Sequence, residues 1–521
     1  MKYSVFCSLI IFFLVISISA QQEDTLIYGD FSYPDTFAPI QDGKSSEYRI
    51  SQLIFDSLLS TTVEGNFVYS LAKDMDVSPD GLSYTFLLQD NIQWHDSTPL
   101  TSKDVEFTIR LLTNPKTYHY DTTLEEYVED ITCLNASILT ITLRKPFYNP
   151  LTLFTFKIFP RHKFSDPILS VDHPFHKKPL GCGPFQIEKE TKQSIEFIAS
   201  PSFHHRGKPH LKKIIVRFYS NREDAWVDLK NQKIHLVAEA PIQREKTLPS
   251  NIVLEKYSSN NIHILAFNHH KEHELYNLFQ SKKFRSILLR SIHREKILSS
   301  CFGKEGTLLT GPFPNHYLEK PSDFPIQPYN VEYAMNQLED FLLAKDYTKN
   351  KNYYEFKGRK LTLRLVYEGG DPFKEQACQE IAQSLEKLGL IIKLEKQTET
   401  QFKKNIFQNH NFDLVYYTYT FTKNSDAFFL LQKPPKTQHH PKNFSGYFST
   451  QLEELIYQFQ NSFNPWMIQK YSQKIHKFAY DETIHLFLWE LNSYVAYREK
   501  LKNFQLHPYY LFNFAERWKI F

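Results

Sequence analysis

The chain has 521 residues, of which 41% are hydrophobic and 23% charged, and its formal net charge is +3. The length suggests about three domains with ordinary globular cores. A charge so close to neutral argues against nucleic acid or a membrane surface as the partner. The 44 phenylalanines and 31 tyrosines are high counts. Most of these rings are expected in cores or half-buried strands, and a surplus is expected to line a ligand cleft.

The N-terminal segment has the order of a secretory signal peptide. Lys2 gives a short positive start, residues 5–18 are largely apolar, and small residues at 17–20 precede a polar run. The apolar part is shorter than the roughly 20 residues that a membrane-spanning helix needs. We therefore expect residues 1–20 to be cleaved and the mature protein to reach the periplasm. Cys7 lies too close to Met1 for a lipoprotein cysteine, so no lipid anchor is expected.

Strands and helices are predicted to alternate through the first half of the chain. Residues 25–29 read as a strand, and a turn-rich segment follows at 32–35. Residues 83–88 and 138–143 alternate between apolar and polar side chains, which predicts two half-buried strands. A helix is predicted after the first strand, because a capping serine at 45 or 46 precedes apolar residues at helical spacing. These residues are Ile50, Leu53, Ile54 and Leu58.

The second half contains a predicted β–α–β unit. A strand at 361–367 leads to a helix capped by Asp371, with Pro372 in the first turn, where a missing N–H costs nothing. Gly389 is suited to end that helix in a left-handed conformation, and a parallel strand at 390–394 follows by a right-handed crossover. One apolar face of the helix packs on the sheet, formed by Ala377, Ile381, Leu385 and Leu388.

A further strand is predicted at 412–416, followed by a polar loop at 418–426. Ligands of open α/β sheets bind beyond the carboxyl ends of the strands. This loop is therefore a predicted ligand site on physical grounds alone.

Four cysteines remain after removal of the signal peptide. They are widely spaced and form no C-x-x-C pair, so neither a zinc site nor a thioredoxin-like motif is indicated. Export permits disulfide bonds, and the sequence does not choose among the three full pairings of Cys133, Cys182, Cys301 and Cys378.

Short motifs in a fixed order run along nearly the whole mature chain. The first passes from Leu71-Ala72-Lys73-Asp74 through Asp80-Gly81-Leu82 and Trp94-His95-Asp96 to Lys103-Asp104-Val105. Later motifs are Gly181-Cys182-Gly183-Pro184-Phe185, residues 201–209, Ile264-Leu265-Ala266-Phe267-Asn268, residues 284–297 and Asn443-Phe444-Ser445-Gly446-Tyr447. Together they resemble the family 5 extracellular solute-binding proteins, the dipeptide-, oligopeptide- and nickel-binding group. Ser97 departs from the glycine that is usual there.

The resemblance implies an α/β, two-lobed periplasmic-binding-protein fold, type II-like and of cluster C, with an extra inserted domain. The ligand cleft would lie between the lobes. The implied domains are a discontinuous first lobe (21–44, 170–262 and 481–521), an inserted domain (45–169) and a second lobe (263–480). The implied partners are a peptide or peptide-like solute and the permease subunits of an ABC importer, with the protein acting as a monomer.

In peptide-binding relatives, the loop after the strand at 412–416 carries a tryptophan and then an aspartate that pairs with the ligand's ammonium. Those positions hold Tyr419 and Thr422 here, so the carboxylate is missing. Leaving an ammonium without its partner costs roughly 2–5 kcal/mol. Either Asp426 replaces the missing group, or the ligand is not a standard peptide held by its N-terminus. Glutathione, another modified peptide, or a different solute would then be the cargo.

Further ligand-contacting positions follow from the resemblance. Ser32, Tyr33 and Pro34 match a turn whose main-chain groups pair with an extended ligand, which reads only what all peptides share. Tyr118 and Tyr120 match an aromatic-bearing loop, and Phe402 lies near another aromatic position. The predicted ligand-binding set is Ser32, Tyr33, Pro34, Tyr118, Tyr120, Phe402, Tyr417, Thr418, Tyr419, Thr420, Phe421, Thr422 and Asp426.

Other functions have weaker support. Nickel transport is an alternative function, suggested by histidine clusters at 204–205, at 269–270 with 273, and at 439–440. None of these clusters has the ligand set of a closed metal site. No catalytic motif or cofactor motif is present, so no enzyme activity, cofactor or resident metal is expected. Pro184 removes a donor that a phosphate cradle at 181–184 would need, so a tight turn entering a strand is expected there. An exported peptidase or adhesin is the alternative from a different class.

Overall fold

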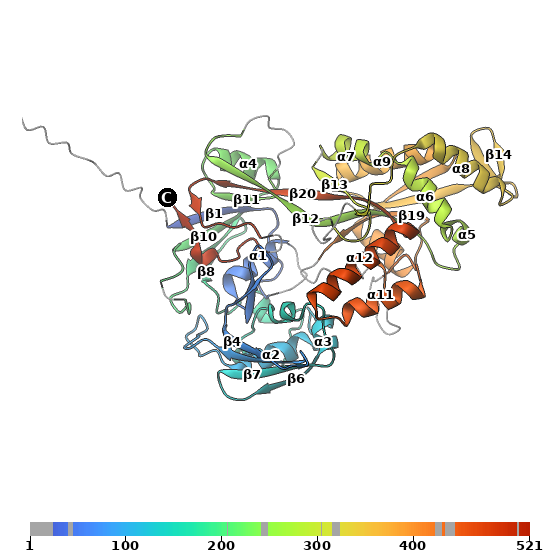
Figure 1. Ribbon diagram of the computed structural model, residues 1–521. Coiled ribbons are helices and arrows are strands. Elements are labelled where there is room, and N and C mark those ends of the chain that lie inside the picture. Colours follow the sequence, from blue (N-terminus) through green and yellow to red (C-terminus); the bar gives the residue numbers. More distant parts are fainter. Residues whose placement is uncertain are drawn as a thin grey trace, which may run out of the picture.

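The computed structural model describes residues 24–39, 45–205, 207–240, 248–303, 305–314, 323–421, 430–432, 443–507 and 510–521. The predicted signal peptide, residues 1–20, lies outside the described residues. Figure 1 shows two lobes connected by two long strands, β12 and β20, with a third unit below the first lobe. Within the described residues, no helix is both long and apolar enough to cross a membrane.

One sheet of eleven strands runs through both lobes in the described part of the chain, in the order β18-β17-β19-β12-β20-β11-β1-β10-β9-β8, with β13 beside β20. Its first-lobe strands are β1 (Thr25–Asp30), β8 (Phe185–Glu190), β9 (Ser194–Ala199), β10 (Lys213–Phe218) and β11 (Leu236–Ala238). Its second-lobe strands are β13 (Gly306–Leu308), β17 (Thr362–Glu368), β18 (Ile391–Gln397) and β19 (Leu414–Thr420). The strands β12 (Ile252–Phe267) and β20 (Leu486–Arg498) belong to both lobes.

The third unit, which we call the inserted unit, is built on the sheet β4-β5-β7-β6. Its strands are β4 (Ala72–Val77), β5 (Ser83–Leu88), β6 (Val128–Cys133) and β7 (Ile138–Leu143), and the short pair β2 (Leu59–Thr61) and β3 (Phe67–Tyr69) lies before them. Alternate residues of β5 and β7 are buried, as the alternating sequence predicts. Its helices are α2 (Ser102–Leu112) and α3 (Thr122–Tyr127), followed by 3-10 turns at Pro150–Phe154, Arg161–Lys163 and Pro174–His176.

Helices cover the sheet in both lobes. The first lobe has α1 (Ser45–Ile54) and α4 (Arg222–Lys230), and near the C-terminus the pair β21 (Leu501–Lys502) and β22 (Lys519–Ile520) with a 3-10 turn at Ala515–Arg517. The second lobe has α5 (Tyr276–Phe279), α6 (Lys282–Ser291), α7 (Arg294–Phe302), α8 (Val331–Leu343), α9 (Pro372–Glu386), α10 (Glu399–Lys403), a π-helical turn (Lys404–Gln408), α11 (Thr450–Gln460) and α12 (Pro465–Glu482). A small sheet of β14 (Thr348–Asn350), β15 (Tyr353–Phe356) and β16 (Arg359–Lys360) flanks it.

The predicted β–α–β unit is confirmed. Asp371 caps α9 by accepting hydrogen bonds from the amides of Phe373 and Lys374, and Pro372 is the first helical residue. Gly389 ends the segment with a φ of +82°, and β17 and β18 pair in parallel. Capping chemistry at both ends therefore determined this helix, as its sequence indicated.

Two predicted elements differ from the structure. The helix α1 ends at Ile54, so Leu58 is not part of it, although Leu58 is fully buried. Strand β19 continues to Thr420, so residues 418–420 of the predicted loop are strand. The extension arises because Thr418 and Thr420 pair with His263 and Asn261 of β12, a long-range pairing that local sequence does not reveal.

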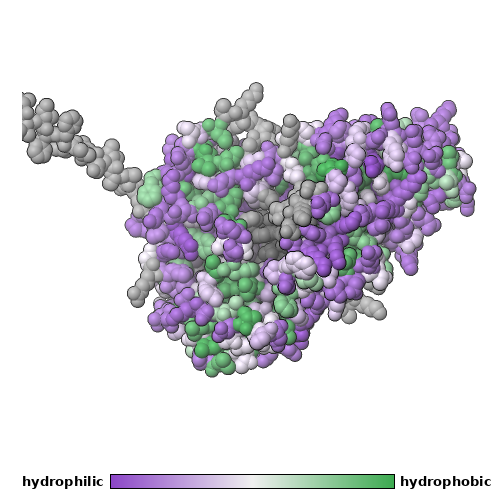
Figure 2. All heavy atoms as spheres, in the orientation of Figure 1, coloured by the Kyte–Doolittle hydropathy of each residue, from purple (hydrophilic) through white to green (hydrophobic). Residues whose placement is uncertain are grey.

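The lobes touch at a point away from the two connecting strands. The ring of Tyr148 in the inserted unit packs against Phe459 of α11, with centroids 4.8 Å apart, and Figure 1 shows α11 beside that unit. One buried cluster accordingly includes side chains from the first lobe, the inserted unit and the facing part of the second lobe. In Figure 2 the outer face of the second lobe is mostly hydrophilic, whereas hydrophobic residues gather over the first lobe and the inserted unit.

Candidate functional site

The parallel strands of both lobes run alongside the connecting strands, and their carboxyl ends lie toward the middle of those strands. In the second lobe, β19 runs antiparallel to β12 from Leu414 beside Phe267 to Thr420 beside Asn261, and β17 and β18 run in the same direction as β19. In the first lobe, β1 and β10 are parallel to β11, which runs along β20 toward its middle. Because ligands of such sheets bind beyond the carboxyl ends of the strands, the candidate site lies where these two edges face each other.

The loop after β1 contains the first three predicted site residues. The carbonyl oxygen of Ser32 accepts a 2.5 Å hydrogen bond from the hydroxyl of Ser46, and Pro34 is buried. The ring of Tyr33 packs on Phe218, with centroids 5.0 Å apart, and its hydroxyl donates to Glu190. The loop is therefore held by side chains of its own lobe, which keeps its remaining main-chain groups in fixed positions.

A buried histidine joins this loop to the predicted aromatic loop of the inserted unit. His176 bonds through Nδ1 to the hydroxyl of Thr36 at 2.7 Å, and Tyr118 packs edge-on against the same ring at 5.4 Å. Tyr118 is half exposed. Burial, followed by the charge of Glu125, raises the pKa of Tyr120. The structure thus brings the 32–34 turn and the Tyr118 loop together, although Pro34 and Tyr118 are 84 positions apart in the sequence.

A buried group of charged side chains lies at the carboxyl end of β1, and the sequence analysis did not predict it. Arg49 on α1 donates to Asp30, the last residue of β1, at 2.9 Å and to Glu239 at 3.0 Å. Burial raises the pKa of Asp30, and the guanidinium of Arg49 opposes that rise. Burial also acts to raise the pKa of Glu239, but Arg49 and Arg222 outweigh it, so this pKa is lowered. The position of Asp30 directly after a predicted strand was the available signal.

The predicted residues of β19 alternate between the two faces of the sheet. The hydroxyl of Thr418 lies 3.2 Å from Nδ1 of His263, while the rings of Tyr417 and Tyr419 lie on the opposite face, within the large buried cluster. Burial raises the pKa of Tyr417 to about 12, with the charge of Glu368 adding to the effect. Thr420 is exposed and donates to the side-chain oxygen of Asn261 at 2.6 Å.

Tyr419, the predicted aromatic platform, is 6% exposed and packs edge-on against Phe421 at 5.2 Å. Phe402 on α10 is 4% exposed and belongs to the same buried cluster. Thr422 and Asp426 lie outside the described residues. Ligand contact by any of these side chains stays a prediction.

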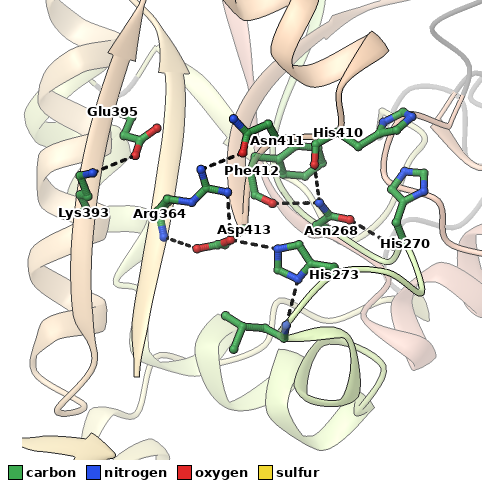
Figure 3. Close-up of polar contacts among 11 residues, drawn as sticks. Asn268, His270, His273, Arg364, Lys393, Glu395, His410, Asn411, Phe412 and Asp413 are labelled. Atoms are coloured by element: carbon green, nitrogen blue, oxygen red, sulfur yellow. Dashed lines mark hydrogen bonds and ion pairs between the residues drawn. The ribbon is translucent and has the colours of Figure 1, made fainter. Parts of the chain in front are cut away.

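A polar cluster fixes the amino end of β19, at the opposite end from the site (Figure 3). Asp413 accepts from Nε2 of His273 at 2.9 Å and from the amide of Arg364 at 2.7 Å. Asn268 donates to the carbonyl oxygens of His410 and Phe412. Burial acts to raise the pKa of Asp413, but the hydrogen bonds from His273 and Arg364 outweigh it and lower that pKa. Asn268 and Asp413 therefore stabilise the amino end of β19, at the end of the strand away from the site.

The histidine clusters of the sequence are used inside the fold. His269 is buried and lies 3.3 Å from the carbonyl oxygen of Ile484, and His270 stacks on His410 with centroids 3.9 Å apart. His204 is buried beside Asp56, at 3.9 Å. Residues 439–440 lie outside the described residues. In the described ranges, no group of three or more histidine, cysteine, aspartate or glutamate side chains is arranged to hold a metal ion.

The 181–184 motif forms a close approach to α1. The amide of Gly183 donates to the carbonyl oxygen of Ile54 at 2.8 Å, and a Cβ at Gly181 would lie 1.8 Å from that oxygen. The predicted entry into a strand is confirmed, since the chain bends at residues 183–184 and β8 begins at Phe185. Burial raises the pKa of the Cys182 thiol, which makes it a poor nucleophile. Cys133, Cys182, Cys301 and Cys378 are free thiols here.

A small cavity lies between the first lobe and the inserted unit. Its volume is about 60 Å³, and Asp56, Lys157, His205 and Glu516 are among its lining residues. Since a water molecule occupies about 30 Å³, this cavity is far too small for a peptide.

The chain is similar in sequence to proteins that bind solutes. A family model described as bacterial extracellular solute-binding proteins, family 5 Middle, matches residues 66–438. The oligopeptide-binding protein AppA of Bacillus subtilis is 23% identical over 516 residues, which cover 96% of this chain and 92% of that protein. Heme-binding protein A of Haemophilus influenzae is 23% identical over 344 residues, covering 59% of this chain and 61% of that protein.

Solved structures share the fold. The structure of AppA from Bacillus subtilis in complex with a nonapeptide has a TM-score of 0.78 at 20% identity and covers 96% of this chain and 99% of its own. That of NikZ from Campylobacter jejuni in complex with Ni(L-His) has a TM-score of 0.78 at 21% identity, with coverages of 95% and 99%. The predicted fold class, a two-lobed α/β binding protein of cluster C, is confirmed.

Proposed function

Because the chain belongs to the bacterial extracellular solute-binding proteins of family 5, the non-catalytic binding components of ABC transporters, we propose that its solute is a peptide or a peptide-like molecule. The observation that carries this proposal is the facing arrangement of the two sheet edges. A ligand lying between them would contact both lobes at once. AppA, which matches nearly the full length of the chain, has been solved with a nonapeptide.

The first-lobe loop supports an extended ligand. It is held in place because the hydroxyl of Ser46 donates to the carbonyl oxygen of Ser32 and the hydroxyl of Tyr33 donates to Glu190, while the other main-chain groups of the turn stay available. Main-chain groups held in this way suit a peptide backbone and tolerate many side chains. The second lobe would supply the more selective contacts, from the ends of β17 and β19.

Capture would work by a shift between open and closed populations. A ligand that contacts both edges favours closure only by its greater affinity for the closed state. Binding at micromolar strength corresponds to about −8 kcal/mol. The packing of Tyr148 against Phe459 would add to the stability of the closed state.

Export, delivery and domain division belong to the same proposal. Residues 1–20 would direct the chain to the periplasm, where the closed protein would act as a monomer and pass its solute to the permease subunits of an importer. The moving parts would be the first lobe (21–44, 170–262 and 481–521) with the inserted domain (45–169), and the second lobe (263–480).

A metal complex is the second candidate, because NikZ, of the same fold, was solved with Ni(L-His). The nitrogens of His269, His270 and His273 face carbonyl, carboxylate and amide groups of the fold. A carried metal would therefore arrive with its own chelating ligand, and the protein would bind the chelate.

The test is native mass spectrometry of protein purified from its own envelope, followed by titration calorimetry with the solute identified. We expect a retained molecule of peptide size, which stays intact during prolonged incubation. Cleavage of the peptide would indicate an exported peptidase instead. If no peptide or peptide derivative binds while a nickel chelate binds at one per chain, the metal-complex candidate replaces this proposal.

A further inference from the structure

A loosely associated pair of opposite charges stands at the carboxyl end of β17. Glu368 is the last residue of the strand, and Lys374 lies in the first turn of α9. The Oε2 atom of Glu368 is 3.8 Å from Nζ of Lys374, and the side chains are 35% and 16% exposed. Within the described residues, these two charged groups make no hydrogen bond, so both retain their capacity for a third partner.

A neighbouring pair shows the contrast. Glu375, one residue beyond Lys374, lies 2.6 Å from Nζ of Lys396 and also accepts from the amide of Gly370. That carboxylate is therefore already bound by two partners. Glu375 is therefore suited as a matched control for Glu368, in the same helix–strand junction and with the same chemistry.

The pair borders the candidate site. Strand β17 lies next to β19, with Tyr367 beside Tyr416, so Glu368 follows at the level of Tyr417. The charge of Glu368 contributes to the raised pKa of Tyr417. On the other face, the charge of Lys374 reaches His263, whose pKa burial lowers to about 3 with Lys374 adding to the effect. His263 in turn bonds Thr418 of β19.

We propose that Glu368 binds the ammonium, and Lys374 the carboxylate, of a ligand that carries both groups on one carbon atom. An α-amino-acid head of this kind can place its two charges against an acid and a base only 3.8 Å apart, and each contact would be a charge-assisted hydrogen bond. The ends of an ordinary peptide are separated by at least one peptide bond and do not fit both partners at once.

This inference rests on the proposed function and narrows it to a substrate class. A peptide joined through the side chain of its first residue, as at a γ-glutamyl end, keeps the free α-amino-acid head. Its ammonium would be bound by Glu368, so it would need no further carboxylate partner in the loop after β19.

The test uses two isomers, γ-glutamylalanine and α-glutamylalanine, which differ only in the linkage. Calorimetry on the full mature chain should give at least about tenfold tighter binding of the γ isomer. In Glu368→Gln and Lys374→Met, binding of the γ isomer should weaken by about thirtyfold or more, since a charged group loses its partner. Glu375→Gln should leave both affinities unchanged. Thermal unfolding of each variant verifies folding before titration.

The outcomes separate the two levels of the proposal. Equal binding of the isomers by the unaltered protein, or an unchanged γ-isomer affinity in folded Glu368→Gln, overturns this inference and leaves peptide capture standing. Binding of ordinary peptides but of neither isomer also overturns it. If the protein binds no peptide or peptide derivative at all, the proposed function itself is contradicted.

Discussion

The contact between Tyr148 and Phe459 offers a direct measure of how closure contributes to affinity. The rings come from the inserted unit and from α11 of the second lobe, with centroids 4.8 Å apart and planes at 54°. An aromatic pair in such a geometry contributes about 0.5–1.5 kcal/mol beyond its buried area. If the contact exists only in the closed state, the whole of that energy enters the binding equilibrium, which is a factor of about 2–12 in Kd.

A double-mutant cycle isolates this term. Tyr148→Ala, Phe459→Ala and the double variant are titrated with the same ligand, and the coupling is the part of the change in Kd that is not additive. The matched control is the pair Tyr347 and Phe356, whose centroids are 5.0 Å apart inside the second lobe. That control pair should couple in the free energy of unfolding but not in Kd. A coupling of zero in Kd for Tyr148 and Phe459, with clear coupling in unfolding, would refute the reasoning.

Three further predictions concern the framework. Gly306→Ala should lower the free energy of unfolding by about 1–3 kcal/mol, because its Cβ would lie 2.6 Å from the carbonyl oxygen of Glu490. Urea titration measures this change, and Thr307→Ala at the exposed neighbouring residue should change the free energy of unfolding little. Asp413→Asn should lower Tm by removing a buried, hydrogen-bonded charge worth about 2–3 kcal/mol, yet leave Kd unaltered, and a large change in Kd would contradict the purely structural role. Burial lowers the pKa of His263, His476 and His485 to about 3 each. In the unfolded chain these rings bind protons near pH 6.5, so their contribution to stability should be fully present above that pH. Below it, the free energy of unfolding should fall toward pH 3 by up to about 1.4 kcal/mol per pH unit for each ring. An unchanged urea midpoint between pH 7 and pH 5 would count against that burial.

Local chemistry made parts of the fold predictable. The cap at Asp371, the proline after it and the glycine at 389 act within a few residues, so the ends of α9 followed from sequence. The strands at 83–88 and 138–143 were equally clear, because alternating burial leaves its period in the sequence.

The site was less accessible to sequence reasoning because its groups meet only in three dimensions. Arg49 reaches Asp30 across 19 positions and Glu239 across 190. The length of β19 depends on its pairing with β12, and the local sequence of β19 contains no signal of that pairing. Glu368 was within reach of sequence reasoning, since it follows the predicted strand at 361–367 directly and thus stands at a carboxyl end.

The ladder between β12 and β20 has a gap where the chain passes from one lobe to the other. Pairing is continuous up to Ser258 with Asn492 and resumes at Ile262 with Glu490, with more residues on β12 than on β20 between these pairs. Rotation at this irregularity would change backbone dihedral angles without breaking the strand pairing on either side. Each cycle of ligand binding and release would then keep nearly the same number of backbone hydrogen bonds. The free energy of closure would therefore depend almost entirely on the contacts made by the ligand and by the facing surfaces of the lobes.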